Sequence, residues 1–169
     1  MGSRAHMAAC WALAVLLAGP AGVAHAQALP GQPVPLEGAA HVPEGTPIAY
    51  QHYPPTSGPH YPRPARWAFY EAEVPEGYWV HNLEHGGIVF LYRCDDDCAA
   101  RVAALRAVYE QLPPSRWGHV KALATPYSRL APPLAAVAWG RIEYYETVDP
   151  ERLIAFYRAF VDQGPEDVP

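Results

Sequence analysis

"GIVFLYRC" (Gly87–Cys94) is the stretch that decides the fold, because it is nearly continuous in β-branched, aromatic and other apolar residues. An apolar run of this length without polar alternation is typical of a strand that is buried on both faces. We therefore expect residues 88–92 to form a central strand. A second apolar run, "LAAVAW" at residues 134–139, is expected to lie beside it at the centre of the sheet.

Two segments on the C-terminal side of this strand have helical spacing. Residues 95–114 ("DDDCAARVAALRAVYEQLPP") place apolar side chains on one face, begin with three aspartates and end in a proline pair. Residues 149–165 ("DPERLIAFYRAFVDQGP") carry the stronger signal, because Asp149 can cap a helix and Pro150 suits its first position. We expect one helix in each segment.

Other segments rich in β-branched and aromatic residues predict further strands. These are residues 78–81 ("YWVH"), 119–127 ("HVKALATPY") and 134–146 ("LAAVAWGRIEYYE"), each read as one strand. Together with the two helices they predict an α+β domain, with a small and mainly antiparallel sheet. We expect residues 47–166 to form this single domain.

A proline-rich arm precedes the predicted domain core. Eleven prolines between Pro30 and Pro75 exclude long helices and central strands. Between residues 50 and 70, six aromatic rings interleave with the prolines, and left exposed they would keep much apolar area in water. We expect this part to wrap on the domain. Residues 27–46 have few rings and are predicted to be a flexible N-terminal segment.

Residues 1–26 have the features of a secretory signal peptide. Arg4 supplies a positive charge, residues 7–23 are apolar but interrupted by Gly and Pro, and "AHAQ" offers a cleavage site between Ala26 and Gln27. The run is too short for a convincing membrane span of about 20 residues, so we expect no transmembrane segment in the mature chain. An uncleaved anchor is the alternative. The expected location is periplasmic or secreted.

The charge balance argues against one class of partner. The chain has 17 acidic and 12 basic residues, a net charge of −5 and no basic cluster. Nucleic-acid binding needs such a cluster to neutralise phosphates, so we expect no nucleic-acid partner. We also expect no nucleotide cofactor. A cell-envelope protein or a small ligand stays open as the partner.

Two cysteines, Cys94 and Cys98, follow the predicted leader in the stretch "YRCDDDCAAR". In an oxidising compartment they most simply form one disulfide bond, which would pin the end of the central strand to the next helix. A thiolate metal pair or a redox pair is the alternative, although redox pairs usually have the spacing C-x-x-C.

Histidines concentrate in two short motifs, "HYPPTSGPH" with His52 and His60, and "HNLEHGG" with His81 and His85. Converging imidazoles suit Zn(II) or Cu(II). Both methionines lie in the predicted leader, which excludes a Met-lined cuprous site. We therefore predict a divalent metal site with these four histidines as candidate ligands. It requires the arm to fold back, so that His52 or His60 lies beside His81 or His85.

Glu84 lies between the last two histidines, and the three residues spell H-x-x-E-H, the inverted-zincin order. Glu84 could be the general base of a metal-dependent hydrolase, or a carboxylate that orients a ring. Hydrolase chemistry needs a stable helix here, and the two glycines and the strand that follow leave room for one helical turn at most. A third reading is a metal-free binding or structural module, in which histidines satisfy buried carbonyl groups.

Four blocks of the sequence resemble one family: "PPTSGPHYP", "WVHNLEHGGIVFLYRC", "AWGR" and "FYRAFVDQGPE". They run from about Tyr50 to Glu166 and resemble the domain of unknown function 3105 family of exported bacterial proteins. The resemblance implies an extracytoplasmic location and a single domain, and it implies no particular activity. Its hallmark blocks, residues 52–61 and 81–87, are those selected above on chemistry.

Overall fold

The structure of the chain is a computed structural model that describes residues 1–2, 28–94 and 98–169. The predicted signal peptide, apart from its first two residues, and its cleavage site lie outside the described residues. Within the described ranges, no helix is long and apolar enough to cross a membrane.

Five strands form one sheet in the order β1-β5-β4-β2-β3. The strands are β1 (Gln32–Pro33), β2 (Ile88–Tyr92), β3 (Ala122–Pro126), β4 (Leu134–Ala138) and β5 (Arg141–Tyr145). β2 runs parallel to β3, and all other neighbours are antiparallel. The predicted α+β class with a mainly antiparallel sheet is therefore confirmed. β2 and β4 are central, and every residue in both is buried.

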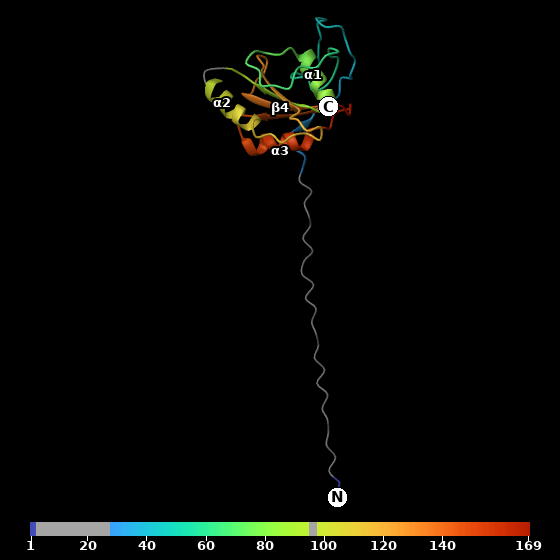
Figure 1. Ribbon diagram of the computed structural model, residues 1–169, viewed down its shortest axis with the longest axis vertical. Helices are drawn as coiled ribbons and strands as arrows, with labels where there is room; N and C mark the ends of the chain where they lie inside the picture. Colours follow the sequence, from blue (N-terminus) through green and yellow to red (C-terminus); the bar gives the residue numbers. More distant parts are fainter. Residues whose placement is uncertain (3–27, 95–97) are drawn as a thin grey trace.

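Helices cover both faces of this sheet. In Figure 1, α1 (Glu76–Glu84) lies on one side of the sheet, and α3 (Pro150–Phe160) lies on the other, with α2 (Cys98–Tyr109). β2 supplies both cores by alternation: Ile88, Phe90 and Tyr92 pack with α2 and α3, whereas Val89 and Leu91 pack with α1. This two-sided burial explains why the strand is apolar at every position.

Residues 78–81 were predicted to be a strand, but they lie in the helix α1. The prediction of two helices was therefore also wrong, because α1 is a third helix. The helix begins after Pro75 and ends before Gly86, which has a positive φ of 76°. Trp79, Val80 and Leu83 face the sheet from one side of it. A run of four aromatic and β-branched residues is too short to distinguish a period of 2 from one of 3.6.

Residues 134–146 form a hairpin rather than one strand. β4 and β5 pair from Leu134↔Tyr145 to Ala138↔Arg141, and only Trp139 and Gly140 connect them. Gly140 has a φ of 66°, which glycine adopts without steric cost. Apolar residues run up to this turn without a break, so the composition did not reveal it.

The helix cap and the disulfide bond that the sequence predicted are both present. Asp149 caps α3 by accepting a hydrogen bond from the Arg152 backbone N–H at 3.1 Å, and Pro150 is the first residue of the helix. Cys94 and Cys98 form a disulfide bond, which joins the chain beyond β2 to the first residue of α2.

The arm lies along both edges of the sheet. Residues 68–70 extend beside β3, where the Ala124 N–H donates to the Ala68 carbonyl at 3.0 Å. The sequence predicted a flexible segment at residues 27–46. In its described part, residues 28–46, β1 pairs with β5, and residues 38–42 form backbone hydrogen bonds with residues 58–60. Backbone pairing with a sheet edge needs no aromatic ring, so ring content was a poor guide to this contact.

Candidate metal centre

The outer face of α1 and its C-cap residue supply three polar side chains, those of His81, Glu84 and His85. Their spacing of i, i+3 and i+4 places them on one side of the helix, opposite the residues that face the sheet. His81 and Glu84 are each only 4% exposed. The prediction of one helical turn at most was wrong, because α1 spans nine residues and carries most of the H-x-x-E-H motif.

The loop from residue 54 to 60 brings His60 to this face. Gly58 adopts a φ of 116°, and its carbonyl oxygen accepts a hydrogen bond from His60 Nδ1 at 2.8 Å. This bond turns Nε2 of the fully buried ring toward Glu84, and His60 Nε2 lies 2.9 Å from Glu84 Oε2. The two sequence motifs therefore meet, with 5.0 Å between the ring centroids of His60 and His81.

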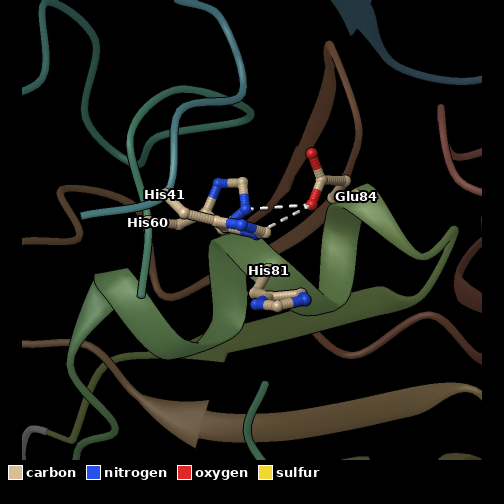
Figure 2. Close-up of side chains that lie close together, drawn as sticks. All are labelled: His41, His60, His81 and Glu84. Atoms are coloured by element: carbon tan, nitrogen blue, oxygen red, sulfur yellow. Dashed lines mark hydrogen bonds and ion pairs between the residues drawn. The ribbon is translucent and has the colours of Figure 1, made fainter. Parts of the chain in front are cut away.

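His41 joins the group from the N-terminal part of the arm. The backbone on both sides of it pairs with His60: His60 N–H donates to the Ala40 carbonyl at 2.9 Å, and Val42 N–H donates to the His60 carbonyl at 2.8 Å. Figure 2 shows His41 and His60 approaching Glu84 together. His41 Nε2 lies 3.6 Å from Glu84 Oε2, and its side chain is 47% exposed. Sequence reasoning missed His41, which stands alone in a segment without a motif.

One ligand atom from each of His41, His60, His81 and Glu84 can be chosen so that all four lie within 4.8 Å of one another. This set is called the primary site below. Four ligands around a tetrahedral ion at 2.0–2.1 Å lie roughly 3.3 Å apart, so a small closure would complete such a site. The described residues can therefore hold a metal ion here.

Hydrogen bonds to the backbone fix the proton positions on two of these rings. His81 Nδ1 lies 2.6 Å from the Tyr61 carbonyl oxygen, as His60 Nδ1 does from that of Gly58. A carbonyl only accepts, so each Nδ1 carries a proton, and in the neutral ring Nε2 carries a lone pair. Burial, and next the neighbouring His60, lower the pKa of His81, although the bond to Tyr61 opposes the shift. Histidines that bind metals are commonly oriented by such Nδ1–H bonds.

The contact between His60 and Glu84 needs a third partner. Nδ1 of His60 already donates to Gly58, so a neutral His60 presents a lone pair toward a carboxylate oxygen at 2.9 Å. Two acceptors at this distance need either an added proton or a cation between them. Since both groups are buried, a bound cation would also offset the cost of removing the carboxylate from water.

His85 lies beside the primary site and next to the C-terminal tail. Its Nε2 is 2.9 Å from Nε2 of His81 and 3.3 Å from Oε2 of Glu166. Because Nε2 of His81 carries the lone pair, His85 donates in this contact. Burial, and next the neighbouring His81, lower the pKa of His85. Glu166, like His41, was not selected from the sequence as a candidate ligand.

The structure does not bring His52 into the group. Its Nδ1 lies 2.9 Å from Glu37 Oε1, and the same oxygen accepts the His52 backbone N–H at 3.0 Å. Of the four histidines that the sequence selected, His60, His81 and His85 come together. The side-chain amide of Asn82 exchanges two hydrogen bonds of 2.9 Å with the backbone of Ala65 and so holds the arm against α1.

The comparisons with known proteins bear on the family and leave the activity open. No curated protein and no solved structure matches the chain. The family model described as "Protein of unknown function (DUF3105)" matches residues 41–169, a range that begins at His41 and contains every residue of the primary site as well as Glu166. Because this match covers well over half of the sequence, the chain belongs to the DUF3105 family.

Proposed function

We propose that the protein binds a divalent transition metal ion, Cu(II) or Zn(II), through the primary site, and that it does so outside the cytoplasm. One observation carries the proposal. His60 and His81 are both buried, both are fixed by Nδ1–H bonds to backbone carbonyls, and each offers a ring nitrogen within 4.8 Å of a carboxylate oxygen of Glu84. This arrangement supplies two lone pairs and a negative charge to one small volume.

A metal-free structural module accounts for this arrangement less well. The bonds from Nδ1 to the backbone would serve such a module, but they leave the Nε2 lone pair of His60 facing the carboxylate of Glu84 in a region that is largely screened from water. Buried acceptors without donors cost about 1–3 kcal/mol each, and a buried carboxylate costs more. A cation removes this cost, because it interacts with all the acceptors at once.

The ligand types favour Zn(II) or Cu(II) over other ions. Three imidazole nitrogens and one carboxylate oxygen form a set that both ions accept, whereas Mg(II) and Ca(II) prefer oxygen ligands alone. The exposure of His41 gives an ion a way in. An extracytoplasmic location is supported by the signal-peptide features of residues 1–26 and by the disulfide bond, since disulfides persist mainly in oxidising compartments.

The test is elemental analysis of the protein purified from the periplasm or the medium without an affinity tag, followed by titration of the metal-free protein with Zn(II) and Cu(II) against a competing chelator. We expect zinc or copper to co-purify. The double variant His60→Asn/His81→Asn should lose tight binding, and His52→Asn is the matched control that should keep it. Equal affinity of the wild type and the double variant would refute the proposal.

A further inference from the structure

We infer that His85 and Glu166, together with the carboxylate of Glu84, form a second cation subsite, so that Glu84 bridges two metal ions. The inference rests on the proposed function, because it takes the primary site as the location of the first ion. It assigns a role to the C-terminal tail, which the primary site does not use.

The geometry meets the requirement for a shared centre. Ligand atoms of Glu84, His85 and Glu166 lie within 4.8 Å of one another, as do those of the primary site. Glu84 belongs to both groups, and a carboxylate has two oxygen atoms with which to serve two ions. The Nε2 atoms of His81 and His85, one from each group, are 2.9 Å apart. Two ions held in this way would lie about as close as in known two-metal sites, at 3.5–4 Å.

Backbone contacts hold the tail in position, so the approach of Glu166 does not depend on its side chain alone. The Asp162 N–H donates to the Gly86 carbonyl at 2.8 Å, and the Glu166 N–H donates to the Glu84 carbonyl at 3.1 Å. Between these two bonds the chain passes so close to α1 that a Cβ added to Gly164 would lie 2.1 Å from the Glu84 carbonyl oxygen. Glu166 is therefore placed by main-chain geometry at the end of the helix.

Lys121 forms hydrogen bonds with both segments, the end of α1 and the C-terminal tail. The Lys121 side chain is fully buried and donates to the carbonyl oxygens of His85 at 2.5 Å and Val168 at 2.7 Å. Its charge is paired with Asp162, whose carboxylate lies 3.3 Å away. The ion-pair partner of this lysine is thus Asp162, and the carboxylate of Glu166 lies beside His85 instead.

The charges also suit two ions. Two adjacent cations repel, and Glu84 and Glu166 supply two negative charges between and beside them. In the absence of metal, the His85 Nε2–H donates toward His81; a metal ion at His85 would take the place of this proton, as metal ligation of histidine requires. The Glu166 side chain is 47% exposed, so water can complete the coordination of the second ion.

The experiment is copper loading of the full metal-free protein, followed by metal analysis and electron paramagnetic resonance. We expect the wild type to retain two Cu(II) per chain after gel filtration, with a spectrum that shows coupling between the ions. Glu166→Gln should retain one ion and show the spectrum of isolated Cu(II). Glu110→Gln, which removes an exposed carboxylate from the far side of the domain core, is the control and should behave like the wild type.

Each contrary outcome has a separate meaning. One Cu(II) in both the wild type and Glu166→Gln would overturn the second subsite and leave the primary site in place. Two uncoupled ions would also overturn it, because the second ion would then lie elsewhere. No bound Cu(II) or Zn(II) in the wild type would refute the proposed function itself. Thermal unfolding of the metal-free variants checks that Glu166→Gln folds, and a melting temperature equal to that of Glu110→Gln is expected.

Discussion

Replacing Glu84 by glutamine separates the metal-binding role of this residue from its structural role. The side chain is 5% exposed, and its Oε2 lies 2.9 Å from Nε2 of His60. Glutamine has nearly the same shape, and its amide N–H can donate to the lone pair that His60 presents. The buried contact between residues 60 and 84 would then join a donor to an acceptor without metal, so we do not expect the free energy of unfolding of the metal-free protein to fall by more than about 1 kcal/mol.

The metal-bound protein should respond strongly to the same change. Glu84→Gln removes the only anionic ligand of the primary site, and a charge-assisted interaction contributes about 1.5–3 kcal/mol, or about 10- to 150-fold in affinity. With free metal at a thousand times the wild-type Kd, binding stabilises the wild type by about 4.1 kcal/mol. A site 100-fold weaker would gain about 1.4 kcal/mol under the same conditions. For a chain of this size, the difference corresponds to about 5–11 °C in melting temperature.

The assay is thermal unfolding of wild type and Glu84→Gln, each with chelator and with zinc. We expect similar melting temperatures with chelator and a much smaller zinc-induced rise in the variant. Glu84→Ala is a useful companion, because it leaves His60 without a partner and should destabilise even the metal-free protein by about 1–3 kcal/mol. An equal zinc-induced rise in wild type and Glu84→Gln would refute Glu84 as a ligand.

Other predictions follow from the tail, the disulfide bond and the buried imidazoles. Gly164→Ala should lower both the free energy of unfolding and the number of bound metal ions, because its Cβ would overlap the last carbonyl of α1; wild-type stability and metal content would contradict this packing. In exported protein, Cys94 and Cys98 should resist maleimide without reductant, and replacing both by alanine should cost about 2 kcal/mol in urea unfolding while metal content stays constant; labelling of unreduced protein would contradict the bond. Burial holds the pKa of His81 below its usual value of 6.5. As the pH falls through about 6.5, His81 therefore binds a proton in the unfolded chain but stays neutral in the folded protein. The resulting stability is present above pH 6.5 and should be lost below it, and an equal urea midpoint at pH 7.5 and 5.5 in metal-free protein would contradict this account.

The fold class could be predicted because burial leaves a direct trace in composition. β2 is buried on both faces and β4 lies beside it, so both had to be continuously apolar. α1 left a weaker trace, since its sheet-facing residues and its polar residues share nine positions, and the consecutive residues Tyr78, Trp79 and Val80 are aromatic or β-branched. The hairpin at Gly140 was hidden for a related reason: both of its strands are largely apolar, and only one glycine marks the turn between them.

Only some residues of the candidate site could be predicted from the sequence, and the difference lies in whether local spacing or tertiary contacts place them. Residues on α1 were found because helical spacing places His81, Glu84 and His85 together without help from the rest of the chain. His60 and His52 have equal standing in their motif, and the choice between them is made by tertiary contacts: the first is turned inward by a bond to Gly58, whereas the second is held by Glu37. No local pattern encodes that difference.

His41 and Glu166 show why the remaining members could not be found. Main-chain hydrogen bonds position both residues. The backbone beside His41 pairs with that of His60, and the N–H of Glu166 donates to the carbonyl oxygen of Glu84. Main-chain bonds carry no side-chain signature, so a sequence gives no reason to single out the residues that they position. The arm, which precedes α1 in the sequence, and the tail, which ends the described chain, thus both reach the same face of this helix. A cation bound there would cross-link both segments to the helix, and because the unfolded chain has no such site, the free energy of binding would appear as folding stability of the arm and the tail.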